Sequence, residues 1–241
     1  MPLVIAALSD VHSPRYVSLL TASINNFVSR GVEVDLVLLA GDLVDKNNYA
    51  YLHIVLKVIE KLRNIHGEVP PILAVFGNEE YQGYEDRYRK LYPHVTWIDD
   101  EIRSLNINGV DLCIVGSRGV LMKPTIWQQR NIPNIESVYR ARVSRIKEML
   151  RVCREKGFTI LVTHYASTLV TLEGEDPRIH PFLGYPILEK LNDNEKPSLA
   201  IHGHVHNSVK IYAKVNSVSV YNVSLPAAKS VTVINIDPGS R

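Results

Sequence analysis

The second apolar segment of the chain reads Val34-Asp35-Leu36-Val37-Leu38-Leu39-Ala40-Gly41-Asp42-Leu43-Val44-Asp45. Its first seven residues are apolar except for Asp35, which predicts a strand that is buried on both faces. The strand is expected to end at Gly41-Asp42, where a turn residue and a carboxylate follow the last apolar position. The same combination, a buried strand followed at once by a reactive side chain, recurs along the chain.

Two further apolar runs flank this strand, at residues 3–8 and 71–76. Between the three runs, residues 14–30 and 52–59 place apolar side chains at helical spacing. Strands and helices therefore alternate as β-α-β-α-β with short connections. This order is typical of a mostly parallel sheet that is covered by helices.

The second half of the chain contains more strands than helices. Strands are predicted at residues 95–98, 102–107, 110–115, 158–163 and 199–202. Asn108-Gly109 indicates a tight hairpin, residues 136–156 form the clearest helical pattern, and residues 208–236 are expected to form a meander. Residues 116–134 and 165–185 lack a regular pattern. Loops of this length in a compact domain are usually functional or mobile, and whether they close over a site as lids is left open.

The composition is that of a globular protein. Of the 241 residues, 46% are hydrophobic and 22% charged, which rules out disorder. No linker or composition break divides the chain, so residues 1–241 are predicted to form a single domain. The net charge of +2 is too small to indicate a nucleic-acid or anionic-membrane partner. No run reaches the roughly 18 apolar residues of a membrane span, and the apolar start does not resemble a signal peptide.

The two cysteines, Cys113 and Cys153, lie far apart, one in an expected strand and one in an expected helix. Two free thiols in a reducing compartment are therefore favoured over a disulfide framework. With no expected membrane span or signal peptide, this predicts a cytoplasmic protein.

Five of the predicted strands end in side chains that can bind metal. The blocks are Asp10-Val11-His12, Gly41-Asp42-Leu43-Val44-Asp45, Gly77-Asn78-Glu79-Glu80, Thr163-His164 and Gly203-His204-Val205-His206. Because the carboxyl ends of strands in open α/β sheets converge on one crevice, groups from distant stretches are expected to meet there. Carboxylate, amide and imidazole groups without thiolates suit first-row divalent metals and argue against a structural zinc site.

Each block alone has an ordinary structural explanation. A strand-end Asp is more often a helix cap, Gly41-Asp42 is a common turn, and a lone His164 would usually be a packed histidine. The two imidazoles after Gly203 are more specific. All five blocks together, each at a strand end, predict a metal site. His202 lies inside its strand, and a packed, hydrogen-bonded role is expected for it.

The blocks resemble those of the calcineurin-like metallophosphoesterases, whose pattern is D-x-H, G-D-x-x-D, G-N-H-[ED], a later His, and G-H-x-H. Four blocks match without exception, and the resemblance spans residues 10 to 206. It implies an α/β fold, a four-layer α-β-β-α sandwich of two mixed sheets with a dinuclear metal centre at the sheet edge. It further implies hydrolysis of phosphoesters by two divalent ions (Mn, Fe, Zn, Co or Ni) that share a hydroxide and bind phosphate oxygens.

By this resemblance, seven side chains would bind the two metals. Asp10, His12 and His206 would hold one ion, Asn78, His164 and His204 would hold the other, and Asp42 would bridge both. Asp45 is expected to orient a ligand without binding metal. Asn78 is also expected to help orient the substrate phosphate.

Glu79 stands where the family has a histidine that contacts the substrate phosphate. Two divalent ions bring about +4, and Asp10, Asp42 and a hydroxide remove about 3, so an ionised Glu79 leaves roughly zero. A phosphomonoester is close to a dianion near pH 7, whereas a diester carries one negative charge. The sequence therefore predicts a preference for diesters, with Glu79 repelling dianions or, if protonated, acting as a general acid. Alternatively, Glu79 turns away and caps a nearby backbone group.

The interpretation that best fits the sequence is a metallophosphoesterase that acts on a small phosphoester, with phosphodiesters favoured over monoesters. Three alternatives stay open, and one of them, a mononuclear metal site with a non-hydrolytic role, would leave several ligands without a purpose. A nuclease of the same family would need a groove or an extra domain, and the near-neutral charge makes it the weaker choice. A catalytically silent binding or scaffold module would be expected to lose ligands, and Glu79 is the one sign in that direction. Arg118 follows a strand and either reaches a phosphate or is a solvated loop residue.

Overall fold

The apolar runs of the first hundred residues form one mixed sheet in the computed structural model, which describes residues 2–237. The sheet contains β1 (Leu3–Leu8), β2 (Leu36–Ala40), β3 (Ile72–Val75), β4 (Val95–Trp97) and β11 (Thr232–Ile236), in the order β11-β1-β2-β3-β4. The strands β1 to β4 are parallel, and β11 pairs antiparallel with β1. The carboxyl ends of β1 to β4 therefore lie at the same edge of the sheet.

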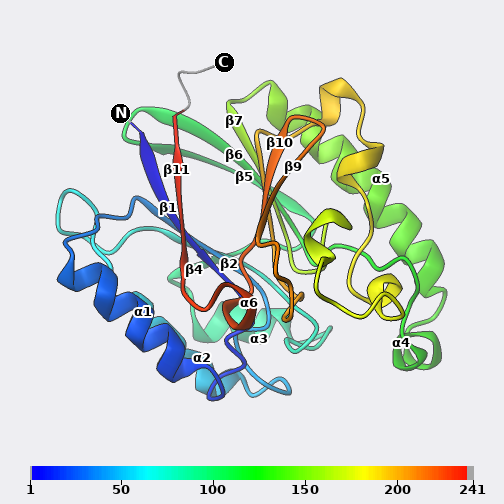
Figure 1. The fold of residues 1–241 in the computed structure, drawn as a ribbon, viewed down its shortest axis with the longest axis horizontal. Coiled ribbons are helices and arrows are strands. Elements are labelled where there is room, and N and C mark those ends of the chain that lie inside the picture. The colour runs from blue at the N-terminus through cyan, green and yellow to red at the C-terminus, as the bar shows by residue number, and fades with distance from the viewer. Residues whose placement is uncertain (1, 238–241) are drawn as a thin grey trace.

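A second mixed sheet faces the first (Figure 1). It contains β5 (Glu101–Ile107), β6 (Val110–Ser117), β7 (Phe158–Thr163), β8 (Leu199–His202), β9 (Tyr212–Val215) and β10 (Val218–Asn222), in the order β5-β6-β7-β8-β10-β9. Its central strands β6, β7, β8 and β10 are parallel, whereas β5 and β9 pair antiparallel at the two edges.

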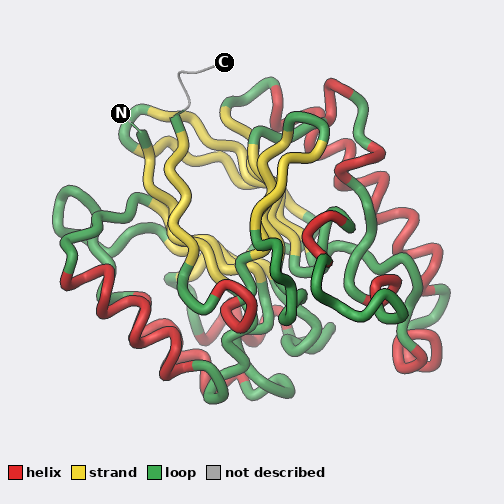
Figure 2. The backbone as a smooth tube through the Cα atoms, in the orientation of Figure 1, coloured by secondary structure: helices red, strands yellow, loops and turns green. Residues whose placement is uncertain are grey.

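Helices cover the outer face of each sheet, as Figure 2 shows. The helices are α1 (Val17–Ser29), α2 (Leu52–Ile59), α3 (Glu85–Leu91), α4 (Ile126–Asn131), α5 (Ile135–Arg154) and α6 (Leu225–Ala228). Residues of α1, α2 and α3 share one hydrophobic core with the first sheet, whereas α5 shares another with the second. A third core lies between the sheets. The four layers are thus helices, first sheet, second sheet and helices, with an apolar core between each layer and the next. This confirms the predicted α-β-β-α sandwich.

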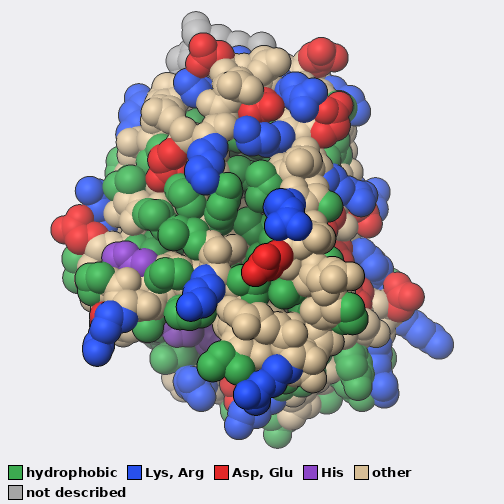
Figure 3. Space-filling model, turned by 90° about the vertical axis from the view of Figure 1, so that its right-hand side faces the viewer, with side chains coloured by type: hydrophobic (Ala, Val, Ile, Leu, Met, Phe, Trp, Pro, Cys, Tyr) green, Lys and Arg blue, Asp and Glu red, His purple; other side chains and the backbone are tan. Residues whose placement is uncertain are grey.

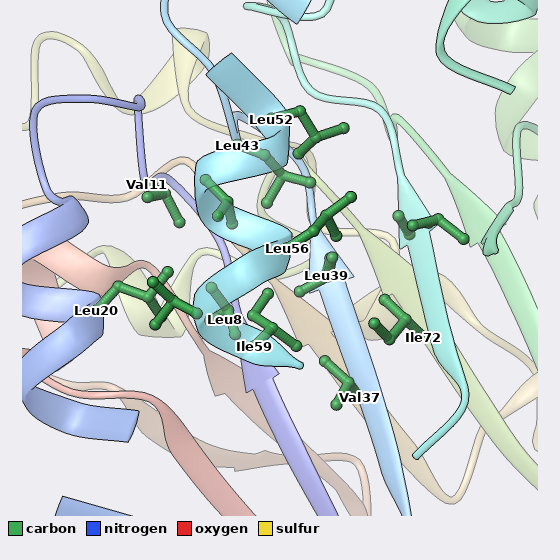
Figure 4. Close-up of a cluster of buried hydrophobic side chains, with 14 of the residues drawn as sticks. Leu8, Val11, Leu20, Val37, Leu39, Leu43, Leu52, Leu56, Ile59 and Ile72 are labelled. Atoms are coloured by element: carbon green, nitrogen blue, oxygen red, sulfur yellow. The ribbon is translucent and has the colours of Figure 1, made fainter. Parts of the chain in front are cut away.

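The helix α2 illustrates how the sequence pattern becomes packing. Leu52, Leu56 and Ile59 lie on one helix face and are buried. They point toward β2, where Leu39 lies on the facing side of the strand (Figure 4). Burial of each such side chain stabilises the fold by about 1.5–3 kcal/mol.

The predicted meander over residues 208–236 is only partly correct. The strands β9 and β10 form the expected antiparallel pair, but β11 leaves the second sheet and pairs with β1 of the first. Alternating apolar residues indicate a strand but do not specify its partner, and β1 offered an open edge. The helix α4 also lies within residues 116–134, which were expected to be irregular.

The prediction of two free thiols is wrong. Cys113 of β6 and Cys153 of α5 form a disulfide with Cα atoms 5.3 Å apart. Both side chains are fully buried where α5 packs on the second sheet. The two positions are 40 residues apart in sequence, so only the docking of the helix brings them together. The prediction of a cytoplasmic location relied partly on free thiols and loses that support.

Across residues 2–237, none of the helices combines the length and the apolar character that a membrane crossing requires. The prediction of one domain over residues 1–241 stays a prediction.

Candidate metal centre

The carboxyl ends of five parallel strands bring the predicted ligands together at one edge of the two sheets. We call these residues the seven strand-end side chains: Asp10 and His12 after β1, Asp42 after β2, Asn78 after β3, His164 after β7, and His204 and His206 after β8. Their side chains form two adjacent groups, each with ligand atoms close enough to hold one ion.

The first group consists of Asp10, His12 and His206, whose candidate ligand atoms lie within 4.8 Å of one another. Asp10 Oδ1 lies 3.0 Å from His206 Nε2 and 3.9 Å from His12 Nε2. The other oxygen of Asp10 accepts hydrogen bonds from the Ser9 hydroxyl (2.5 Å) and the His204 backbone N–H (2.9 Å). These two donors fix the carboxylate so that Oδ1 faces the imidazoles.

The second group consists of Asp42, His164 and His204, again within 4.8 Å. His164 Nδ1 lies 2.9 Å from the Ala40 carbonyl oxygen, which leaves Nε2 free to face Asp42 Oδ2 (3.4 Å) and Asn78 Oδ1 (3.0 Å). Asp42 Oδ2 is also 3.8 Å from His12 Nε2 of the first group. Asp42 therefore lies between the two groups.

The backbone at this edge adopts conformations that ordinary residues avoid. Asp10, His12, Asp42 and His204 have φ values of 56°, 42°, 52° and 68°. Left-handed backbone is uncommon for residues other than Gly and costs on the order of 1 kcal/mol or more per residue, and such strain clusters at functional sites. A Cβ at Gly77 would lie 2.1 Å from Asp42 Oδ1, so this position requires glycine for Asp42 to keep its place.

Charge is concentrated in this buried edge. Burial opposes ionisation of Asp10, but the hydrogen bond with His206 and the charge of His164 hold the pKa of Asp10 well below its usual range. Burial alone would lower the pKa of His164, but the Asp42 carboxylate outweighs it and raises that pKa to about 9. Burial and His164 lower the pKa of His204 to about 4. The two buried carboxylates thus place negative charge in this site, and divalent ions would neutralise that charge.

His12 provides a direct test of whether metal fits this site. Its ring is buried, yet neither Nδ1 nor Nε2 has a hydrogen-bond partner among residues 2–237. Buried polar atoms are nearly always hydrogen-bonded, so an imidazole without a protein partner is suited to bind an ion. His12 Nε2 faces both Asp10 and Asp42, which is the orientation that a metal ligand needs.

Comparison with known proteins supports the same conclusion. The sequence matches the family of calcineurin-like phosphoesterases over residues 3–208. This chain belongs to that family. A search of the curated proteins finds no match.

Solved structures of low sequence identity share the phosphoesterase fold of this chain. One is the phosphopantetheinyl hydrolase of Mycobacterium tuberculosis, with a TM-score of 0.64, 15% identity and coverage of 99% of this chain and 97% of the other. The sulfate thiohydrolase of Thermus thermophilus has a TM-score of 0.58 and 14% identity, covering 96% and 53%. GAP50, the anchor in the inner membrane complex of Plasmodium, has a TM-score of 0.55 and 16% identity, covering 94% and 72%.

Glu79, where the sequence departs from the family pattern, caps a backbone group. Its Oε2 accepts from the Lys46 N–H at 2.6 Å, which is the capping expected in one alternative, but Glu79 does not turn away, since its Oε1 lies 3.4 Å from Asn78 Nδ2. The carboxylate therefore stays beside the metal centre. Asp45, expected to orient a ligand, has Oδ1 at 3.8 Å from His12 Nδ1.

Glu80 is the residue of this phosphoesterase whose importance the sequence did not reveal. It is fully buried, and its carboxylate accepts from the backbone N–H groups of Asp42 (2.8 Å), Leu43 (2.7 Å), Val44 (3.3 Å) and Gly77 (2.7 Å). One side chain thus ties the ends of β2 and β3 together. The available signal was its place at the end of the block Gly77-Asn78-Glu79-Glu80, where the family pattern has an acidic residue.

Arg118 and His202 both have structural contacts. Arg118 is buried, donates to the carbonyl oxygens of Gly77 and Glu80, and forms an ion pair with Glu85 at 2.8 Å. It is therefore neither a solvated loop residue nor free to reach a phosphate. His202 is fully buried and lies 2.7 Å from the Thr171 hydroxyl, as expected for a packed histidine.

Proposed function

We propose that this protein is a metal-dependent phosphodiesterase and that the seven strand-end side chains hold two divalent ions. The observation that carries the proposal is the pair of adjacent ligand groups with Asp42 between them. When bound, such a pair of ions supplies a nucleophile at neutral pH and neutralises charge on a phosphoester. Mn, Fe, Zn, Co and Ni all suit the nitrogen and oxygen donors.

The residues around the ligands have distinct tasks in this proposal. Ser9 and the His204 backbone aim Asp10, the Ala40 carbonyl aims His164, and Glu80 holds the loop that carries Asp42. Asn78 contributes a neutral oxygen, which leaves more positive charge on the centre than a carboxylate would. Small phosphoesters fit a chain of formal charge +2 better than nucleic acid does.

Metal removal tests this proposal. Purified protein is assayed with bis(p-nitrophenyl) phosphate before and after EDTA treatment, and each of the five metals is then added back separately. We expect turnover to fall to background with the loss of about two ions per chain and to return with at least one metal. Turnover that survives complete metal removal would contradict the proposal. Tight metal binding without hydrolysis of any ester would favour a binding protein, and cleavage confined to DNA or RNA would favour a nuclease.

We further propose that the charge of Glu79 favours diesters over monoesters. Both contacts of its carboxylate are made as a hydrogen-bond acceptor, which supports an electrostatic role over proton donation. A second negative charge on a bound monoester would be repelled by this carboxylate in a partly dry site, whereas a diester has only one charge.

Substitution of Glu79 tests the charge argument. For Glu79→Gln, we expect the ratio of kcat/KM for bis(p-nitrophenyl) phosphate to that for p-nitrophenyl phosphate to fall by about tenfold or more. The amide keeps the shape and its one oxygen can still accept from Lys46, while its NH₂ group replaces the oxygen that lies 3.4 Å from Asn78 Nδ2. Glu79→His should lower the ratio further. A wild-type preference for the monoester, or an unchanged ratio in Glu79→Gln, would refute the argument.

A further inference from the structure

The metal centre opens into a hollow beneath α4. A cavity of about 430 Å³ is lined at one end by Asn78 and His204 of the metal centre. A neighbouring cavity of about 400 Å³ extends from Asn78 toward α5. The two cavities share Trp127, Gln128 and Tyr165. We call this combined space the α4 hollow. A substrate bound at the metals would therefore have room for one of its ester groups on this side.

Exposed aromatic rings line the α4 hollow. Trp127 is 65% exposed, Tyr81 45% and Tyr84 42%. Figure 3 views the molecule from the side of α5 and shows hydrophobic side chains gathered between Lys and Arg in the upper half of the view, whereas Figure 1 places α4 in the lower half. A large aromatic side chain that is exposed in a cavity beside a metal centre is typical of a ligand-binding surface.

The helix α4 is held in place over the metal centre. Gln128 forms a capping box with Thr125 at the start of the helix, and its side-chain amide donates to the Tyr165 hydroxyl at 3.2 Å. The Tyr165 ring in turn packs against His204, with centroids 4.9 Å apart. This connection fixes Trp127, the neighbour of Gln128, at the mouth of the hollow.

The arginines that line the hollow are already paired with carboxylates. Arg118 is paired with Glu85, and Arg142 with Asp100 at 2.8 Å. Glu79 lies at the end near the metals. Among the described lining residues, no Lys or Arg is therefore without a carboxylate partner. The lining does not favour binding of a second phosphate or another anion. Aromatic faces and amides instead suit a flat, uncharged ring with polar edges.

We propose that the α4 hollow binds a flat, uncharged aromatic group of the substrate, of the nucleobase type, and that Trp127 is a specificity-determining residue that stacks on it. This inference adds a substrate class to the proposed phosphodiesterase function, and its inhibition test rests on that function. The favoured substrate class is thus a phosphodiester with one nucleoside-like ester group.

Fluorescence tests binding without requiring turnover. The sequence contains two Trp, of which Trp97 is buried and stacked on Phe76, so Trp127 is the ring that a ligand can reach. Adenosine added to the metal-loaded protein is expected to quench fluorescence with saturation, whereas ribose should not. In Trp127→Phe the saturable quenching should disappear. Quenching that does not saturate, or that persists in Trp127→Phe, would overturn the inference.

Inhibition tests whether the hollow belongs to the substrate site. Adenosine is expected to inhibit hydrolysis of bis(p-nitrophenyl) phosphate competitively. In Trp127→Ala, the inhibition constant of adenosine should rise by a factor about ten times larger than the factor for inorganic phosphate. Loss of one stacked ring has an effect of this size. Ile126→Ala is the matched control, since Ile126 is 67% exposed on the same helix but lies outside both cavities.

The two experiments separate the inference from the proposed function. Saturable quenching in a protein that hydrolyses no ester would support the aromatic site and contradict the phosphodiesterase. Hydrolysis without saturable quenching, or with equal inhibition constants for adenosine in wild type and Trp127→Ala, would overturn the aromatic site and leave the phosphodiesterase in place.

Discussion

Asp42→Asn is expected to lower kcat/KM for bis(p-nitrophenyl) phosphate by about 10³-fold, because the effect of a correctly held metal ion on such a reaction is several kcal/mol. Asp42 Oδ2 lies 3.4 Å from His164 Nε2 of its own group and 3.8 Å from His12 Nε2 of the other, so this oxygen faces both ligand groups. The amide keeps the volume of the side chain but removes the negative charge. The metal content, measured on the same sample, should fall below that of the wild type.

Asp86→Asn provides the matched control for this prediction. The Asp86 side chain is fully exposed at the start of α3, where its ion pair with Arg89 at 3.6 Å contributes little. This variant should retain the metal content and kcat/KM of the wild type. An Asp42→Asn protein that keeps both ions and more than a tenth of the activity would show that Asp42 does not bridge the metals.

Glu80→Gln should lower the free energy of unfolding by about 1–3 kcal/mol for each buried backbone N–H group that loses its acceptor. The Glu80 carboxylate accepts four backbone N–H groups from the ends of β2 and β3. Glutamine has one acceptor oxygen, and its NH₂ group would face N–H donors, leaving buried polar groups without partners. Urea unfolding of the metal-free protein measures the change without a contribution from metal binding.

Glu148→Gln on α5 is the control for Glu80→Gln. Glu148 is exposed and pairs with Arg151 on the helix surface, so this substitution should change the free energy of unfolding by less than about 0.5 kcal/mol. If Glu80→Gln were as stable as Glu148→Gln, the four hydrogen bonds would not be what holds the ends of β2 and β3.

The sequence predicted the strands and the side chains that follow them because both are local patterns. The run from Leu36 to Ala40 is apolar at every position, and a strand buried on both faces has no other simple pattern. The ligand blocks follow such strands directly, so predicting the parallel strands also predicted where the seven side chains would meet. Glu80 was missed because its role lies in backbone donors from Asp42, Leu43 and Val44, which no spacing along the chain identifies.

Contacts between distant segments were decided by the tertiary structure. Asp35, the polar residue in the first apolar run described, accepts from the Val4 backbone at 2.8 Å and from the Asn108 side chain at 2.9 Å. Cys113 and Cys153 became a disulfide because α5 docks on β6, and β11 joined the first sheet because β1 had an open edge.

The family and the candidate ligands could therefore be predicted from the amino-acid sequence, since carboxylates and imidazoles that follow several buried strands meet where parallel strands end. The shape of the space beside the metals could not. It depends on the Gln128–Tyr165 hydrogen bond that holds α4 and on the ion pairs of Arg118 and Arg142. Each of these contacts joins residues more than thirty positions apart, and such contacts exist only after the layers have packed.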